Sequence, residues 1–384
     1  MELSLTKAET RIVELAERIA TDVLAKHAAA ADHGAFPAHN IAELGPTGLL
    51  GVKIPAEFGG LAGSNVAAVH AIRALARSCP STAVTVAVTN MVADMILRFG
   101  GPEQHQKFLP KLCSGTWLAG SFALSEPSAG SDAASLRTRA EKVDGGYRLN
   151  GEKLWITSGD VAGVILVMAK TDPSAGARGI STFLVEPAMP GFSVGRHEEK
   201  LGLLGSSTVS LAFSDMFVPD ANRLGPEGIG FEVAMVALDG GRCGIGAQAV
   251  GMGEAALNAI AQAVEARKKG DRALGTDQGA QFRVADVATR LDAAWLLVLR
   301  AASLRDAGKK MTKEAAMAKV FATEAGNFAC QQAVALCQGA ALDRHSPAAR
   351  LLRDVRVSRI YEGTSEIQRL VIARHLAASV SHAR

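Results

Sequence analysis

Cysteine is scarce in this chain and is not arranged for metal binding or cross-linking. Its five cysteines form no Cys-x-x-Cys pair and no His-x-Cys spacing among 384 residues. The sequence therefore predicts no disulfide framework and no metal site, and a reducing compartment fits best. Cys330 and Cys337 are about two helical turns apart, so we expect both in the core of a helix.

An excess of charge of one sign is also absent. The 41 Lys and Arg residues nearly balance the 38 Asp and Glu residues, and the net charge of +3 is too small to predict a nucleic-acid surface. The first residues, MELSLTKAET, carry charges at once and lack the apolar segment of a signal peptide. The longest apolar stretch, residues 84–97, contains Asn90 and Asp94 and falls short of the roughly 20 residues that a membrane helix needs. We therefore expect a cytoplasmic protein that binds neither nucleic acid nor a membrane.

Hydrophobic periodicity divides the chain into three regions. Residues 1–118 carry apolar residues mainly at helical spacing, and residues 119–222 contain short β-branched runs between glycines and prolines. Residues 223–384 return to long alanine-rich helical patterns. The predicted fold class is α+β, with an N-terminal helical domain, a middle β domain and a C-terminal helical domain. Within the first region, residues 84–89 alternate, and this pattern alone predicts a strand.

The middle region shows the clearest strand signals. Two runs on either side of Asn150-Gly151 predict a hairpin, because Asn-Gly is favoured in tight turns between antiparallel strands. Further strands are expected over residues 163–170, 179–186 and 208–218. Since no helical pattern separates them, we predict an antiparallel sheet or a small barrel.

The C-terminal region predicts helices over residues 231–269, 278–307 and 312–338. Long helices with short connections are typical of an antiparallel four-helix bundle. Residues 244–249 satisfy the GxGxxA pattern of a dinucleotide site, with Glu265 near the expected acidic position. Such a site needs a βαβ unit, and a helical pattern follows instead. We therefore expect these glycines to allow close helix packing and predict no nicotinamide site.

A short segment near the C-terminus carries the most informative residues. Ile360–Arg369 reads IYEGTSEIQR and places the carboxylate of Glu362 beside Gly363 and two hydroxyls. One interpretation is a helix N-terminus capped by Thr364 or Ser365. The other is chemical, because glycine lets the backbone approach a ligand closely and a positioned carboxylate can abstract a proton. The two interpretations are compatible.

Two segments of the middle region combine small, hydroxyl and aromatic residues. Residues 122–132 read FALSEPSAGSD, which is either an ordinary loop entering a sheet or a set of backbone N–H groups and hydroxyls suited to an anionic cofactor. Trp155-Ile156-Thr157 ends the predicted hairpin, where a tryptophan is more often part of the core than a cofactor contact.

A third segment, Asp239-Gly240-Gly241-Arg242, begins the long helical region. The aspartate and arginine form either a buried structural salt bridge or part of a ligand channel, and spacing alone leaves both interpretations open.

Taken in order, these motifs resemble the acyl-CoA dehydrogenase family, and the short-chain (butyryl-CoA) enzymes in particular. The similarity extends over essentially the whole chain and includes IYEGTSEIQR, FALSEPSAGSD, the Trp-Ile-Thr segment and the Asp-x-Gly-Arg segment. The resemblance implies the helical, β, helical order of that family, with a four-helix bundle at the C-terminus. It also implies a helix, not a strand, over residues 84–89.

The resemblance assigns roles to residues of this chain. Glu362 is the expected base that removes the α-proton of an acyl-CoA thioester, while the β-hydride passes to the flavin of FAD. Residues expected to contact FAD are Phe122, Leu124, Ser125, Ser131, Trp155, Ile156, Thr157, Arg267, Gln278, Gly339, Thr364 and Glu366. Residues expected to contact the acyl-CoA substrate are Ser131, Asp239, Arg242, Tyr361 and Gly363. An electron-transfer flavoprotein is the implied electron acceptor, and a homotetramer is the implied assembly.

Some relatives place their glutamate immediately before the arginine of the third segment, and here that position is Gly241. Glu362 therefore has no competitor as the base. The resemblance also places the acyl tail against residues 81–99, with Val86, Val88, Asn90 and Met91 as candidates for its lining. A short acyl-CoA such as butyryl-CoA is the predicted substrate, and a branched, aromatic or carrier-protein-bound acyl group remains open.

Two segments depart from the family pattern at positions that hold the flavin of a neighbouring subunit. Gly270 and Asp271 replace a phenylalanine and a glycine, and Ala335 and Gln338 replace the glutamine and a glycine of a second motif. Losing an aromatic stack costs on the order of 1 kcal/mol, and losing a hydrogen bond to a charged pyrophosphate costs about 1.5–3 kcal/mol. The alternatives are weaker flavin binding in a homotetramer, a hetero-oligomer with a paralogous partner, a helper subunit without turnover, or an oxidase that uses oxygen directly.

Overall fold

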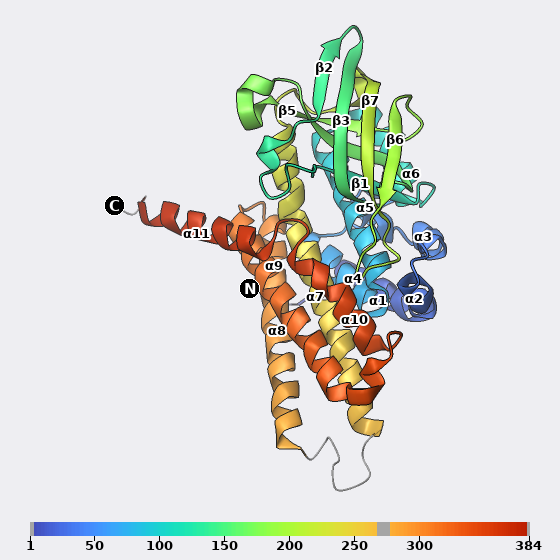
Figure 1. Ribbon diagram of the computed structural model, residues 1–384, viewed down its shortest axis with the longest axis vertical. Helices are drawn as coiled ribbons and strands as arrows, with labels where there is room; N and C mark the ends of the chain where they lie inside the picture. The colour runs from blue at the N-terminus through green and yellow to red at the C-terminus, as the bar shows by residue number, and fades with distance from the viewer. Residues whose placement is uncertain (1–3, 267–276, 382–384) are drawn as a thin grey trace.

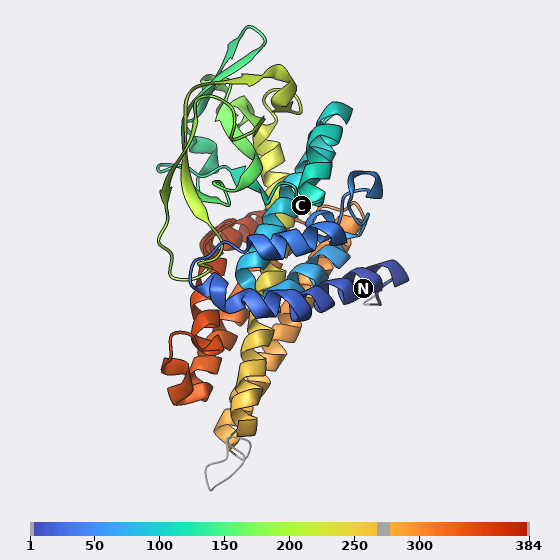
Figure 2. The same cartoon turned by 90° about the vertical axis from the view of Figure 1, so that its right-hand side faces the viewer.

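The computed structural model describes residues 4–266 and 277–381 as a helical N-terminal part, a sheet and a helical C-terminal part. The sheet lies at one end of the molecule, and the long C-terminal helices extend away from it (Figure 1). The N-terminal helices cross the C-terminal ones on one side (Figure 2). The N-terminal α-helices are α1 (Lys7–Ile19), α2 (Ala25–Asp32), α3 (Ala38–Leu44), α4 (Asn65–Ser78), α5 (Pro80–Phe99) and α6 (Pro102–Cys113).

Local sequence signals explain where the N-terminal helices begin. Thr6 caps α1 by a capping box, in which its hydroxyl accepts from the Glu9 N–H at 3.2 Å and the Glu9 carboxylate accepts from the Thr6 N–H at 2.8 Å. Ser64 caps α4, since its hydroxyl accepts from the Ala67 N–H at 3.0 Å. These contacts satisfy backbone donors that the first turn of a helix leaves free.

Helix α5 runs through the middle of the molecule (Figure 2). Residues 84–89 belong to this helix, so the strand that alternation predicts for them is wrong. Nearly the whole α5 surface is covered by α4, α6, the long helix of residues 230–266 and the sheet, so its apolar residues need not follow a one-sided helical period. The helix expected from family resemblance is therefore confirmed. Within the described residues, α5 is also long and apolar enough to cross a membrane, but 78% of that stretch is buried inside the protein, as a core helix is.

The sheet has eight strands in the order β6-β7-β3-β2-β4-β5-β8, and β1 pairs with β4. The predicted purely antiparallel sheet is wrong in one respect, because β1 and β2 both pair with β4 in parallel. The sheet is therefore mixed. Its strands are β1 (Ala119–Ala123), β2 (Arg139–Val143), β3 (Gly146–Thr157), β4 (Ala162–Lys170), β5 (Ile180–Val185), β6 (Phe192–His197), β7 (Thr208–Pro219) and β8 (Arg223–Leu224).

The hairpin of the middle region turns at a different dipeptide from the predicted one. Strand β3 passes straight through Asn150-Gly151, with a bulge there against β7. The tight turn is at Asp144-Gly145, which joins β2 to β3 with Val143 opposite Gly146, and Gly145 has φ 71°. Asp-Gly and Asn-Gly both suit this turn, and pairing with β7 decides between them.

The C-terminal part consists of α7 (Gly230–Ala266), α8 (Gln278–Asp306), α9 (Thr312–Cys337), α10 (Pro347–Arg356) and α11 (Ser365–Ser381). Helices α7 to α10 pack together, and α4 packs onto them. The glycines of the GxGxxA pattern lie inside α7, where a Cβ at Gly246 would approach Val298 to 2.9 Å. Cys330 and Cys337 are buried in α9, as predicted.

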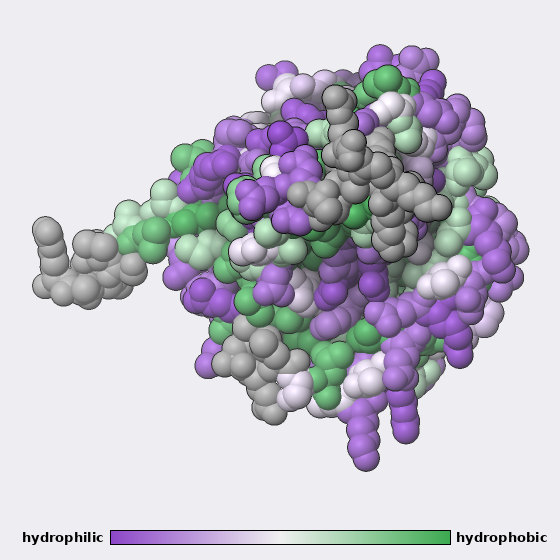
Figure 3. Space-filling view, turned by 90° about the horizontal axis from the view of Figure 1, so that it is seen from below, coloured by the Kyte–Doolittle hydropathy of each residue, from purple (hydrophilic) through white to green (hydrophobic). Residues whose placement is uncertain are grey.

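Helix α11 leaves the body of the molecule and projects to one side (Figures 1 and 3). Its exposed surface includes Leu370 and Leu376, which retain 48% exposure each. The projecting helix thus exposes apolar side chains together with charged ones.

Candidate active site

Glu362 lies in the turn between the 3₁₀ segment Val357–Arg359 and α11. Its φ of 52° is in the left-handed region, which is uncommon for a non-glycine residue. The carboxylate rests against Gly241 of α7, where a Cβ would lie 1.9 Å from Oε2. A glycine at position 241 is therefore required for this placement, and strained backbone of this kind is typical of functional sites.

Three side chains, those of Lys319, Gln368 and Gln248, hold the turn around Glu362. The Lys319 ammonium donates to the carbonyls of Tyr361 at 2.9 Å and Gly363 at 2.6 Å. The Gln368 amide donates to the Gly363 carbonyl at 2.9 Å and the Glu362 carbonyl at 3.3 Å. The Tyr361 hydroxyl donates to the Gln248 side chain. Because bonds are made on both sides of Glu362, its backbone is held in the strained conformation.

The electrostatics of this turn suit a base that works near neutral pH. Burial raises the pKa of Glu362 to about 7, against the lowering effect of the charges on Lys319 and Arg242. The Oε2 atom is shielded from solvent and has no hydrogen-bond partner among the described residues. Burial also lowers the pKa of Lys319 to about 8, with Glu362 opposing this effect. A carboxylate with a free oxygen and a pKa near 7 can accept a proton from a bound ligand.

The Asp239 and Arg242 side chains form the salt bridge that spacing allows. Arg242 Nη1 donates to Asp239 Oδ1 at 2.7 Å, and Thr312 donates to Asp239 Oδ2 at 2.5 Å. Arg242 is buried, yet its Nε has no partner in the part of the chain that the structure describes. The pair thus lies within one helical turn of Gly241, on the helix against which the Glu362 carboxylate rests.

The serine-containing loop after β1 is held by a buried ion pair that sequence reasoning missed. Lys153 Nζ donates to Glu126 Oε1 at 2.7 Å, with the side chains 0% and 4% exposed. The Thr138 N–H also donates to that oxygen at 3.0 Å. A lysine in a half-buried strand was the available signal. Of the predicted contacts in this loop, Leu124 is buried, Phe122 and Ser125 are half-buried and Ser131 is exposed.

Trp155 is exposed, so the alternative interpretation of a core tryptophan is wrong, and the flavin contact stays a prediction. Its side chain retains 56% exposure and its φ is 61°, at a bulge in the pairing of β3 with β7. The Leu154 N–H donates to the Ser125 carbonyl at 3.0 Å, which joins the Trp155 segment to the serine loop. Ile156 is buried and the Thr157 carbonyl accepts from Ser121 at 2.7 Å. An exposed aromatic ring beside a hydroxyl-rich loop is a surface that a flat ligand can cover.

The remaining predicted flavin contacts lie in three places. Thr364 caps α11 beside Glu362, accepting from the Ile367 N–H at 3.3 Å, and Glu366 is exposed in the first turn. Gln278 begins α8 and Gly339 follows α9, both exposed at the end of the bundle remote from the sheet (Figure 1). The fold therefore does not bring these two to the serine loop of the same chain. Arg267 lies outside the described residues, as do Gly270 and Asp271.

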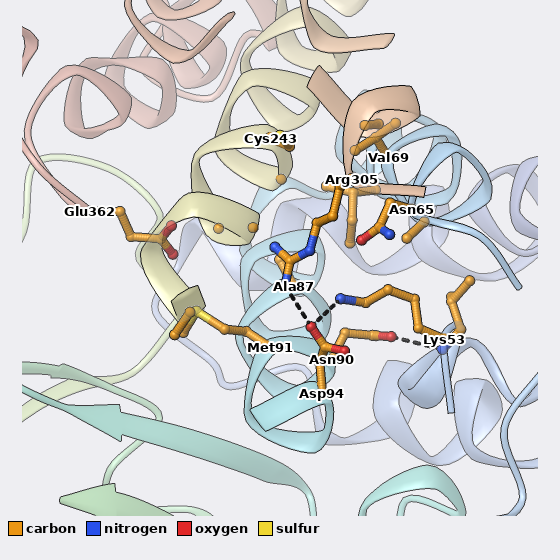
Figure 4. A pocket seen from close by; sticks show the side chains of 18 residues that line it. Lys53, Asn65, Val69, Ala87, Asn90, Met91, Asp94, Cys243, Arg305 and Glu362 are labelled. Carbon is orange, nitrogen blue, oxygen red and sulfur yellow. Dashed lines mark hydrogen bonds and ion pairs between the residues drawn. The ribbon is translucent and has the colours of Figure 1, made fainter. Parts of the chain in front are cut away.

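A cavity of about 60 Å³ opens beside Glu362, between α4, α5, α7 and α8. Figure 4 shows Glu362 on one side of it and Asn90, Met91, Asp94, Lys53 and Arg305 on the others. Of the four predicted lining residues, Asn90 and Met91 do line it, whereas Val86 and Val88 are buried elsewhere in α5. Asn90 is occupied in the fold, since it accepts from the Val52 N–H at 2.7 Å.

Sequence models of three protein-family domains match the chain in the observed order. They are the N-terminal domain of acyl-CoA dehydrogenase over residues 6–116, its middle domain over 121–216 and its C-terminal domain over 228–377. This chain belongs to the acyl-CoA dehydrogenase family. An acyl-CoA dehydrogenase of Bacillus subtilis is 45% identical over 342 residues, which cover 89% of this chain and 90% of that protein.

Solved structures of the acyl-CoA dehydrogenase family share the whole fold. Butyryl-CoA dehydrogenase from Megasphaera elsdenii superposes with a TM-score of 0.95 at 37% identity, covering 98% of this chain and 100% of that one. PigA with FAD and proline superposes with a TM-score of 0.93 at 28% identity, covering 98% and 99%. The helical, sheet, helical architecture predicted from resemblance is thereby confirmed, and the chain is an acyl-CoA dehydrogenase-type oxidoreductase.

Two of the residues that depart from the family pattern, Ala335 and Gln338, are among the described residues. Both lie at the end of the bundle remote from the sheet. Ala335 is exposed in the last turns of α9, and Gln338 is exposed just after it with φ 51°. Both are therefore far along the bundle from the serine loop and Glu362 of the same chain (Figure 1).

Proposed function

We propose that this acyl-CoA dehydrogenase removes the α and β hydrogens of a short-chain acyl-CoA, giving the trans-2-enoyl-CoA, with Glu362 as the α-proton base. The Glu362 carboxylate carries the proposal, because it has a pKa of about 7 and a free Oε2 at the wall of the cavity beside the turn. A base is efficient when its pKa lies near the working pH.

FAD is the proposed cofactor, and this chain offers a surface that fits it. The Trp155 ring is exposed beside the loop of Ser125 and Ser131, and the Thr157 segment lies on the same strand. When bound, FAD supplies the acceptor for the β-hydride. Side chains of Trp155 and the two serines would hold it, and the superposition with a structure that contains FAD supports this proposal.

The residues of this chain have three tasks in the proposed reaction. Glu362 takes the α-proton at its free oxygen, which needs the carboxylate to be ionised. Lys319 keeps the turn in place and limits how far burial raises the pKa of Glu362. The buried Arg242, its half-buried partner Asp239 and the walls of α5 and α7 restrict water around the carboxylate, which strengthens the electrostatic interactions within the site.

The cavity supports a short acyl group. A volume of about 60 Å³ corresponds to about four to six water-sized groups at roughly 10–15 Å³ each. A chain of eight carbons or more would require the walls to move. The butyryl-CoA dehydrogenase that shares the fold supports the same length. A branched, aromatic or carrier-protein-bound acyl group is the alternative substrate.

The proposed assembly is a homotetramer that passes electrons to an electron-transfer flavoprotein. The exposed leucines of the α11 arm support an oligomer, because such a surface is rarely left open to water. The second candidate is a hetero-oligomer in which a paralogous partner completes the flavin site, and the departures at Ala335 and Gln338 favour it. A cytoplasmic location is part of the proposal.

The first experiment is the visible spectrum of the purified protein before and after butyryl-CoA is added without oxygen. A yellow protein whose flavin bleaches supports the proposal, and Glu362→Gln should abolish the bleaching while retaining the flavin. The control variant is Glu103→Gln, which alters an exposed carboxylate on α6. A yellow protein that no acyl-CoA bleaches contradicts the proposed reaction, and a colourless protein that ignores added FAD points to a missing partner. Peroxide formed under air identifies an oxidase.

A further inference from the structure

The side of the cavity opposite Glu362 is charged, which a pocket for a plain hydrocarbon tail does not require. Asp94 of α5 lies there with three cations around its carboxylate. Lys53 Nζ and Arg305 Nη2 approach Asp94 Oδ2 at 2.7 Å and 2.9 Å, and Arg98 Nε approaches Oδ1 at 3.0 Å. Figure 4 shows Lys53 and Arg305 converging on Asp94 beside the cavity.

This cluster carries more positive than negative charge. Lys53, Asp94 and Arg305 are 15%, 4% and 9% exposed, whereas Arg98 keeps 43% and reaches solvent. Two shielded cations therefore share one shielded carboxylate. Burial lowers the pKa of Lys53, with Asp94 opposing this effect and Arg305 adding to it. Burial by itself would raise the pKa of Asp94, but the surrounding cations outweigh it and hold that pKa low. Excess buried charge is costly unless a further partner compensates it.

One hydrogen-bond donor of the cluster has no acceptor among the described residues, and its side chain lines the cavity. Arg305 Nη1 is shielded from solvent and has no hydrogen-bond partner among residues 4–266 and 277–381. It lies against Gly240, where a Cβ would come within 1.9 Å of it, while the Glu362 carboxylate lies against the next residue, Gly241. The leftover donor and the proposed base thus border one short cavity, and both line it. An unsatisfied guanidinium N–H in such a place is a binding group for an acceptor.

We propose that the acyl group of the substrate ends in a carboxylate, which Arg305 Nη1 binds at the end of the cavity away from Glu362. The inference rests on the proposed function, since it places the thioester end of the same substrate at Glu362. A carboxylate supplies both the missing acceptor and the missing negative charge, and a guanidinium suits it better than an ammonium does. The cavity of about 60 Å³ leaves room only for a short acyl group. The substrate class is therefore the mono-CoA thioester of a short dicarboxylic acid.

The test compares three thioesters as substrates of the flavin-loaded wild-type enzyme. They are butyryl-CoA, the mono-CoA thioester of a five-carbon dicarboxylic acid, and the methyl ester of the latter, which has similar length without the charge. We expect kcat/KM for the acid to exceed that for both neutral substrates by about 10- to 100-fold, the range for one hydrogen bond between charged groups. Equal or lower turnover of the acid overturns the inference, and equal turnover of acid and ester shows that length, not charge, is recognised.

Two variants test whether Arg305 recognises the carboxylate. Arg305→Gln should reduce the ratio of kcat/KM for the acid over that for butyryl-CoA by about tenfold or more, and Arg305→Lys should restore part of it. The matched control is Arg300→Gln on the same helix, an arginine that is 52% exposed and pairs with Glu314. A ratio that Arg305→Gln leaves unchanged contradicts the assignment. If none of the three thioesters bleaches the wild-type flavin, the proposed function has failed; if butyryl-CoA alone does, only this inference has failed.

Discussion

Replacing Lys319 with methionine is the sharpest test of how this site sets the pKa of Glu362, the proposed base. Lys319 is completely buried in α9 and donates to the carbonyls on either side of Glu362. Its charge is the larger of two that lower the pKa of Glu362, and burial raises that pKa to about 7 in spite of both charges. Methionine has a similar length and no charge. Lys319→Met should therefore raise the pKa of Glu362 further.

The size of the effect follows from the titration. An opposite charge close to a carboxylate lowers its pKa by about one or more, so its loss moves the pKa of Glu362 from about 7 to about 8 or above. A base acts in its ionised form, so activity requires a pH above this pKa. At pH 7 the ionised fraction falls from about one half to about one tenth, and kcat/KM falls about fivefold. The loss is recovered at pH 9.

The assay is kcat/KM for butyryl-CoA from pH 5.5 to pH 9.5 with an artificial electron acceptor. The control is Lys313→Met, which removes a lysine of the same helix that is 32% exposed. Circular dichroism and flavin content show whether the variant is folded, because the Tyr361 carbonyl loses its donor at a cost of about 1–3 kcal/mol. The Gly363 carbonyl keeps its hydrogen bond from Gln368. The fall of kcat/KM at low pH should shift to higher pH in Lys319→Met. If the variant is folded and loaded with flavin and this shift is absent, the reasoning is refuted.

Three further changes have defined outcomes. Gly241→Ala should lower kcat by at least about tenfold with KM little changed. The added methyl group would lie 1.9 Å from the Glu362 carboxylate, and misplacing a catalytic group is costly. Steady-state rates equal to those of the wild type would contradict this contact. Trp155→Ala should release flavin on gel filtration, measured as the ratio of visible to ultraviolet absorbance, since it removes an exposed ring. Because the folded pKa of Glu362 is raised from 4.5 to about 7, its ionisation costs stability as pH rises through that window. Glu362→Gln should therefore raise the melting temperature at pH 8 relative to wild type and change it less at pH 5.

Patterns with a local cause could be predicted from the sequence. The spacing of Cys330 and Cys337 predicts a helix core, and long alanine-rich stretches predict α7, α8 and α9. Features decided by neighbours in space could not be predicted in this way. Asp144-Gly145 and Asn150-Gly151 are equivalent as turn signals, and only the pairing of β3 with β7 selects the first.

The candidate site shows the same division. The turn of Glu362 follows from one motif of adjacent residues, so sequence could predict it. The charged end of the cavity comes from three separate segments, because Lys53, Asp94 and Arg305 meet only in the folded chain. Within α5, a single aspartate among apolar residues reads as an isolated surface charge, and nothing in the sequence indicates its partners. Glu126 and Lys153 also meet only in the folded chain, and a lysine in a half-buried strand is the one local signal of that pair.

The Gly240-Gly241 pair explains how one short cavity can hold the Arg305 guanidinium at one end and the Glu362 carboxylate at the other. A Cβ at either position would collide, at 1.9 Å, with Arg305 Nη1 in one case and Glu362 Oε2 in the other. Without side chains, α7 lets the guanidinium and the carboxylate pack directly against its backbone. The two charges then stay apart on neighbouring positions and do not pair, so each keeps a free polar atom toward the cavity. A substrate with an acidic α-carbon at one end and an acceptor at the other satisfies both atoms at once, which an unsubstituted acyl tail cannot do.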